Sequence, residues 1–202
     1  MLPQFFYGFF NYFSGQTLYD SFIYQLFNLV YTSVPIMIYA IFDQEFNDKI
    51  LMNNHLNYYL QGIRKKLFNT RVFWNGFLLA LAQALIILFW SFFSVIRNFI
   101  NSDGFMLDFW HGGTMVYGLC LVVSNFKILV ISNTFSFISC FFVFFSLFLY
   151  LVSILIIDVY KDSELYGVFE PIFATGNFHF GNILTIFCCT FLDFALLMKN
   201  SS

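Results

Sequence analysis

Long apolar stretches alternate with shorter polar ones along this chain. A helix needs about 20 predominantly apolar residues to cross the roughly 30 Å hydrocarbon core of a bilayer. Five stretches reach or closely approach that length: residues 19–42, 72–96, 113–131, 135–157 and 180–198. The pattern therefore predicts an all-α polytopic membrane protein with five full transmembrane helices.

The apolar patch from Phe5 to Phe13 is too short to cross the membrane. It is interpreted either as the outer half of a helix whose beginning is absent or as a segment lying in the interface. Asn133 and Thr134 leave only a very short connection between the third and fourth spans. These two helices are therefore expected to form an antiparallel hairpin.

Composition supports a membrane location. The chain is 60% hydrophobic and 24% aromatic, and only 10% of its 202 residues are charged. An ordinary soluble domain carries about 25% charged residues, and a chain of this length cannot hide so much apolar surface in one core. The net charge of −2 gives no basic surface for nucleic acid, so no nucleic-acid partner is expected.

Positive charges are concentrated in the connection from residue 43 to 71, which contains Lys49, Arg64, Lys65, Lys66 and Arg71. The connections before the third and fifth spans offer only Arg97 and Lys161. Because lysine and arginine favour the cytosolic side, loop 43–71 and the carboxyl terminus are predicted to be cytosolic. The basic loop is interpreted as a topology signal, with specific binding of anionic lipid as the alternative.

The first span contains several polar residues and a proline: Gln25, Asn28, Thr32, Ser33 and Pro35. Lipid supplies no water to such groups, so they should face protein or a wet cavity. Pro35 removes the backbone hydrogen bond to residue 31 and should kink or open the helix. Asn28 and Thr32 share one face by their spacing. A transport site and hydrogen bonding between helices, worth about 1 kcal/mol, both remain open.

Lys127 lies toward the cytosolic end of the third span, and a charge at the bilayer centre would cost about 3 kcal/mol or more. Its ammonium group could extend to the headgroups. Asp193, near the cytosolic end of the fifth span, is an alternative partner. Asn125 lies on another side of the same helix, so Asn125 and Lys127 are not expected to serve one site.

Residues 13–45 read FSGQTLYDSFIYQLFNLVYTSVPIMIYAIFDQE. This sequence resembles the end of the fifth and all of the sixth transmembrane helix of phospholipid flippases, a branch of the P-type ATPases. The similarity continues through Tyr59, Gly62, Phe68-Asn69, Phe73-Trp74, Asp108, Trp110, Gly113-Thr114, Tyr117 and Val123-x-Asn125-x-Lys127. It covers residues 5–131, with Gln83 in place of a common histidine. Beyond residue 131 the match is one of hydropathy.

The resemblance implies the carboxyl-terminal membrane bundle of a P-type ATPase. Residues 1–18 would then be the end of the fifth helix with an outer loop, and residues 19–202 the flippase-type transmembrane domain. The implied function is a share in ATP-driven aminophospholipid translocation, with Asn28, Thr32 and Pro35 as candidates in the lipid path. Membrane phospholipid is the implied substrate, and the rest of the pump or an accessory subunit the implied partner.

The chain lacks the D-K-T-G-T phosphorylation loop on which P-type ATPases form an aspartyl phosphate. Its one Asp-Lys pair, Asp48-Lys49, is followed by Ile50-Leu51. No catalytic, cofactor-binding or metal-binding residue is assigned, and ATP and Mg²⁺ are implied only for the complete family protein. The chain alone is therefore not expected to hydrolyse ATP. The alternative function is a non-catalytic, stand-alone polytopic membrane protein with a structural or regulatory role.

Overall fold

The apolar runs of the sequence fold as helices, which bond their backbone polar groups internally as lipid requires. The structure is a computed structural model that describes residues 2–44, 48–53, 60, 62–63, 69–96, 109–134, 136–161, 163–174 and 176–201. Every regular element in these ranges is helical, which confirms the all-α class. The basic residues Arg64, Lys65, Lys66 and Arg97 lie outside the described residues, as do Tyr59, Phe68 and Asp108.

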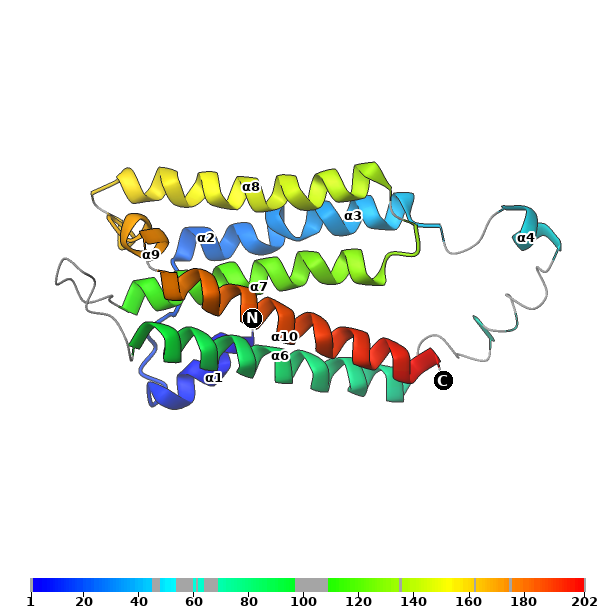
Figure 1. Cartoon of the computed structure of the whole chain (residues 1–202), viewed down its shortest axis with the longest axis horizontal. Coiled ribbons are helices and arrows are strands. Elements are labelled where there is room, and N and C mark those ends of the chain that lie inside the picture. Colours follow the sequence, from blue (N-terminus) through cyan, green and yellow to red (C-terminus); the bar gives the residue numbers. More distant parts are fainter. Residues whose placement is uncertain are drawn as a thin grey trace.

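Five helical segments are long and apolar enough to cross a membrane: Ser21–Phe42, Thr70–Phe92, Phe109–Ile131, Phe137–Val159 and Phe178–Met198. The five predicted spans are thereby confirmed. The elements of Figure 1 are α1 (Leu2–Phe10), α2 (Ser21–Leu26), η1 (Phe27–Tyr31), α3 (Ser33–Phe42), α4 (Asp48–Asn53), α6 (Thr70–Ile96), α7 (Phe109–Ile131), α8 (Phe137–Val159), α9 (Phe169–Ala174) and α10 (Gly176–Ser201). The first span consists of α2, η1 and α3.

Helix boundaries differ from the apolar runs by a few residues. The first span begins at Ser21 because the Asp20 carboxylate accepts hydrogen bonds from the N–H groups of Phe22 and Ile23, at 3.0 and 3.1 Å, as an N-cap residue does. Helices α7 and α10 begin four residues before the predicted spans. Their first turns are less apolar, so hydropathy alone does not include them.

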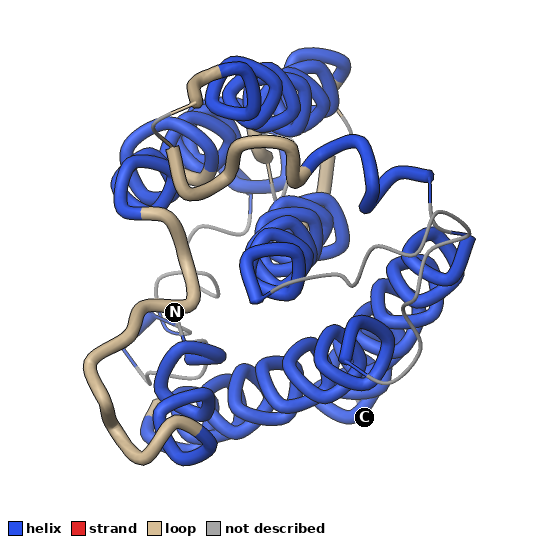
Figure 2. Tube along the Cα trace, turned by 90° about the vertical axis from the view of Figure 1, so that its left-hand side faces the viewer, coloured by secondary structure: helices blue, strands red, loops and turns tan. Residues whose placement is uncertain are grey.

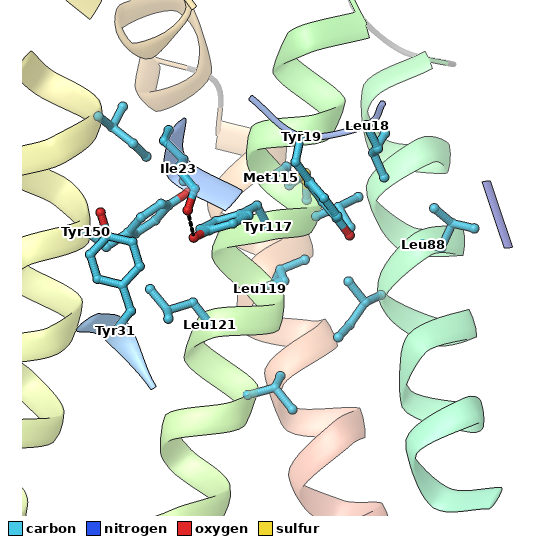
Figure 3. Close-up of a cluster of buried hydrophobic side chains, with 14 of the residues drawn as sticks. Leu18, Tyr19, Ile23, Tyr31, Leu88, Met115, Tyr117, Leu119, Leu121 and Tyr150 are labelled. Atoms are coloured by element: carbon cyan, nitrogen blue, oxygen red, sulfur yellow. Dashed lines mark hydrogen bonds between the residues drawn. The ribbon is translucent and has the colours of Figure 1, made fainter. Parts of the chain in front are cut away.

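Helix α7 lies in the middle of the bundle (Figures 1 and 2) and is the most buried of the five spans. It packs against α3, α6, α8 and α10. Its Tyr117 hydroxyl donates a hydrogen bond of 2.6 Å to the carbonyl oxygen of Ile23 on α2 (Figure 3). The central helix is thus covered by four neighbours, whereas a smaller share of each of the other spans is buried.

The exposed surface of the outer helices contains many of the phenylalanines. On α8, the side chains of Phe141, Phe144 and Phe148 are more than half exposed, and their spacing places them on one face. Phe187 and Phe191 are similarly exposed on α10. In a membrane such faces contact acyl chains or other membrane helices, so an exposed phenylalanine carries no penalty there.

Helices α7 and α8 form the predicted antiparallel hairpin, whose tip is joined to the end of α3 (Figure 1). The Asp43 carboxylate accepts hydrogen bonds from the backbone N–H groups of Asn133 and Thr134, at 3.0 and 2.9 Å. The Thr134 hydroxyl donates a third at 3.2 Å. These bonds, led by the Thr134 N–H, hold the pKa of the Asp43 carboxyl below its ordinary value. The carboxylate therefore stays charged at neutral pH and joins the first span to the hairpin.

The amino-terminal apolar patch forms the helix α1, which packs against α6. Its Tyr7 ring is buried and stacks on Phe92, with ring centroids 5.6 Å apart. The chain then crosses the end of the bundle, where the Gln4 side-chain oxygen accepts a 2.7 Å hydrogen bond from the Leu18 N–H. Leu18 lies so close to α7 that a Cβ atom at Gly113 would collide with its carbonyl oxygen. Only glycine fits at that point of α7.

Candidate functional site: polar groups within the helix bundle

The polar first span is not one continuous α-helix. Between α2 and α3 the chain makes a π turn, in which the Thr32 N–H donates to the Phe27 carbonyl oxygen five residues earlier, at 3.0 Å. The Thr32 hydroxyl donates to the same oxygen at 2.8 Å, and the Ser33 hydroxyl donates to the carbonyl oxygen of Asn28. The expected local opening of the helix is thus present as a π turn that ends four residues before Pro35. Such turns occur frequently at functional sites.

Pro35 has no N–H, so the carbonyl oxygen of Tyr31 lacks its usual helical donor. Two neighbouring helices supply donors instead. The Ser146 hydroxyl of α8 donates to this oxygen at 2.5 Å, and the Asn125 Nδ2 of α7 donates to it at 3.4 Å. Asn125 Nδ2 also donates to Ser146 Oγ at 3.2 Å, and the side chains of Pro35, Asn125 and Ser146 are buried. The carbonyl freed by the proline therefore joins three helices.

Ser146 was not identified from the sequence. The signal that could have found it is Pro35 itself, because a proline in a helix predicts an unpaired acceptor four residues earlier. A buried acceptor needs a donor, so a hydroxyl in another span was to be expected.

Asn28 faces a different direction. Its side chain is exposed and lines an open pocket of about 260 Å³ between α1, η1, α6 and α7. Among the described residues of the pocket wall, Gln83 and Ser124 are the other polar ones, and neither Thr32 nor Pro35 contributes to the wall. The π turn contains one more residue per turn than an α-helix, so residues four apart across it do not align as they do in an α-helix. The structure thus separates Asn28 from the two other lipid-path candidates.

Lys127 forms an ion pair with Asp193. Its Nζ lies 3.0 Å from Asp193 Oδ1, the side chains being 31% and 5% exposed. Gln83 of α6 bonds to both: its Nε2 donates to Asp193 Oδ2 at 3.0 Å and to the Cys189 carbonyl oxygen at 3.1 Å. Its Oε1 accepts from Lys127 Nζ at 3.4 Å. The pairing of Lys127 with Asp193 is confirmed, and Asn125 binds elsewhere, as expected.

Gln83 belongs both to the ion-pair cluster (Lys127, Asp193 and Gln83) and to the wall of the Asn28 pocket. The cluster joins α6, α7 and α10, so it fixes one wall of the pocket. The sequence showed Gln83 only as a replacement for a histidine. Its role depends on two helices distant in sequence.

The pocket offers hydrogen-bonding groups on an otherwise apolar wall. Asn28 carries an exposed carboxamide, which both donates and accepts hydrogen bonds. The carboxamide of Gln83 is bonded to Asp193, Cys189 and Lys127. The Ser124 hydroxyl donates to the Cys120 carbonyl oxygen at 2.7 Å. Among the described residues, no group of three or more histidine, cysteine, aspartate or glutamate side chains could hold a metal ion. The arrangement suits recognition of a polar group at membrane depth.

Comparison with known proteins gives a match over nearly the whole chain. The model of the family described as "Phospholipid-translocating P-type ATPase C-terminal" matches residues 1–201. The phospholipid-transporting ATPase IH of Homo sapiens is 31% identical over 181 residues, or 87% of this chain. The Mus musculus protein of the same name is 28% identical over 92% of the chain, and phospholipid-transporting ATPase IG of Homo sapiens 26% over 99%. The chain spans 16–18% of the length of these relatives.

Proposed function

Since this chain belongs to the family of carboxyl-terminal membrane parts of phospholipid-translocating P-type ATPases, we propose that it forms one wall of the lipid path in an ATP-driven aminophospholipid flippase. One observation carries the proposal. Asn28 stands on a π turn and lines an open pocket of about 260 Å³ whose wall also contains Gln83. The stand-alone scaffold is the less favoured alternative, because it gives no reason for an exposed carboxamide at this depth.

The chemistry of the pocket fits an aminophospholipid headgroup. Such a headgroup presents phosphate oxygens that accept hydrogen bonds and an amine that donates them. The carboxamide of Asn28 can do both, and it does so without the desolvation cost of a buried charge. The apolar residues around the Asn28 carboxamide suit the part of the acyl chains next to the headgroup. Thr32 and Pro35 act indirectly in this proposal, because they shape the turn that presents Asn28.

ATP and Mg²⁺ belong to other parts of the complete pump in this proposal. The rest of the pump and an accessory subunit are the proposed protein partners, and the exposed apolar faces of the outer helices offer them contact area. The contribution of this chain is then the helix scaffold and the polar wall, while the aspartyl-phosphate chemistry is supplied elsewhere.

We also propose an orientation from the positive charges. Loop 43–71 and the carboxyl terminus would face the cytosol, which places α9 on the opposite side. In a cysteine-free background, a cysteine in place of Lys49 is expected to react with a membrane-impermeant maleimide only from the cytosolic side. A cysteine in place of Lys161, in the connection after α8, should react only from the other side. The reverse labelling would overturn the orientation.

The lipid-path proposal is tested by substitution of Asn28 in the full-length pump. Loss of one hydrogen bond to the headgroup costs about 0.5–1.5 kcal/mol, so Asn28→Ala should lower lipid-stimulated ATP turnover roughly two- to tenfold or change headgroup preference. Asn28→Leu should lower it further, because leucine also fills the pocket. The measurement is ATP turnover against phosphatidylserine, phosphatidylethanolamine and phosphatidylcholine.

Leu29→Ala is the matched control. Leu29 lies on the same π turn and is 71% exposed, as Asn28 is exposed, but it does not line the pocket. It should leave turnover unchanged. If both Asn28 variants transport like the wild type but melt at lower temperature, Asn28 only joins helices and the lipid-path proposal fails.

A further inference from the structure

A second, larger cavity lies on another side of the central helix α7. Its volume is about 310 Å³, and its walls come from α7, α8, α9 and α10. None of its described lining residues lines the Asn28 pocket. The short helix α9, which lies at one end of the bundle (Figure 1), contributes Phe169, Ile172 and Phe173 to the wall. For comparison, an apolar cavity of about 150 Å³ already accepts benzene, so this cavity has room for a larger apolar molecule.

The polarity of the cavity changes with depth. Thr114, His179 and Asn182 lie toward the end covered by α9, whereas Val122 and Ile186 lie deeper in the bundle. From Thr114 to Val122 the wall extends about 12 Å along α7, at 1.5 Å per residue, which is less than half of the roughly 30 Å core. The cavity therefore lies within one leaflet, polar at the interface and apolar toward the bilayer centre.

One polar group in the cavity wall lacks a partner. The side-chain oxygen of Asn182 is buried and accepts no hydrogen bond within the described part of the chain. The two hydroxyl groups of the described wall have partners: the Thr114 hydroxyl donates to the Trp110 carbonyl oxygen at 2.8 Å. The Tyr150 hydroxyl donates to the Thr114 carbonyl oxygen at 3.3 Å. A buried carboxamide oxygen without a donor is costly, so an occupant that donates one hydrogen bond is favoured.

We propose that this cavity binds a sterol-type lipid alcohol, with the hydroxyl donating to Asn182 Oδ1 and the apolar body extending toward Val122 and Ile186. Among the described lining residues none is aspartate, glutamate, lysine or arginine, so a phosphate-bearing headgroup meets no lysine or arginine counter-charge from them. A bare acyl chain leaves the Asn182 oxygen unpaired. A lipid with one hydroxyl on an apolar body satisfies both ends of the cavity.

The aromatic side chains of the wall favour a rigid occupant. Phe169 and Phe173 stack with ring centroids 4.3 Å apart. The ring centroids of Phe173 and Phe178 are 5.3 Å apart. All three line the cavity. A stack of rings offers flat apolar surfaces, which a fused-ring body covers with little loss of conformational entropy, whereas a flexible chain must be ordered to do so.

The test is photolabelling of the purified protein in lipid nanodiscs with a photoreactive cholesterol analogue that keeps its hydroxyl. Labelling is expected on peptides of α7 and α10 and should be displaced by unlabelled cholesterol. Asn182→Leu should lower labelling about two- to tenfold, the effect of one lost hydrogen bond. Asn182→Ser, which retains an acceptor, should restore part of it. Val122→Phe, which fills the deep end, should abolish it.

Asn28→Leu is the matched control, because it makes the same side-chain change in the other pocket and should leave labelling intact. Cholesteryl methyl ether, which cannot donate, should compete weakly. Equal competition by the ether, or labelling unchanged in Asn182→Leu and Val122→Phe, would overturn the proposal. Equal displacement by a phospholipid would show that an ordinary acyl chain fills the cavity.

Discussion

Replacement of Lys127 by methionine is expected to destabilise the protein by about 3–5 kcal/mol, the usual cost of removing one partner of a buried ion pair. Methionine keeps the apolar stem but leaves Asp193, which is 5% exposed, without its counter-charge. Gln83 can still donate to the carboxylate, but it brings no charge. The measurement is thermal unfolding in nanodiscs, where the melting temperature should fall by roughly 10 °C.

The double variant Lys127→Met with Asp193→Asn is expected to recover most of that loss, because a neutral carboxamide can share hydrogen bonds with Gln83. Lys161→Met, in the exposed connection after α8, is the matched control and should melt like the wild type. If Lys127→Met is as stable as this control, the ammonium group contributes nothing through Asp193, and extension to the headgroups describes Lys127 better.

Substitution of Gly113 by alanine is expected to displace the segment that crosses the end of the bundle. The new Cβ atom would collide with the carbonyl oxygen of Leu18, and this backbone cannot yield easily, because its N–H is bonded to Gln4. Overpacking of this kind costs about 1–3 kcal/mol. Thermal unfolding should show the loss, while circular dichroism should show unchanged helix content below the transition.

Gly76→Ala is the control for the glycine substitution. Gly76 lies in α6, and a Cβ atom there would meet nothing within 4 Å. Since alanine favours a helix interior over glycine by about 0.5–1 kcal/mol, this variant should melt at the wild-type temperature or slightly above. Equal melting temperatures for the two glycine variants would mean that the crossing segment moves freely away from α7.

The number of spans and the α7–α8 hairpin could be predicted because the thickness of the bilayer fixes helix length without reference to neighbours. The pairing of Lys127 with Asp193 could be considered because both charges lie toward the same end of their helices. The contribution of Gln83 could not, since which helix lies beside α7 and α10 is decided by packing between distant segments.

In the first span, too, some features could be predicted from the sequence and others could not. Pro35 predicted a freed carbonyl, but not that Asn125 and Ser146 would occupy it. The sequence also placed Asn28 and Thr32 on one face, which assumes an unbroken α-helix. A π turn leaves the apolar content of the segment unchanged, so hydropathy carries no trace of it.

The π turn also sets the angular phase of the whole first span. Each residue of an α-helix advances the chain by about 100° around the helix axis. One additional residue between α2 and α3 therefore rotates α2 by that angle relative to its position in an unbroken helix. The Ile23 carbonyl oxygen meets Tyr117 of α7 in this turned position. Loss of a single residue from Phe27–Tyr31 would therefore rotate α2 by more than a quarter of a circle and carry Ile23 away from the central helix. In the evolution of this segment, a one-residue change in length acts as a rotation of its outer half.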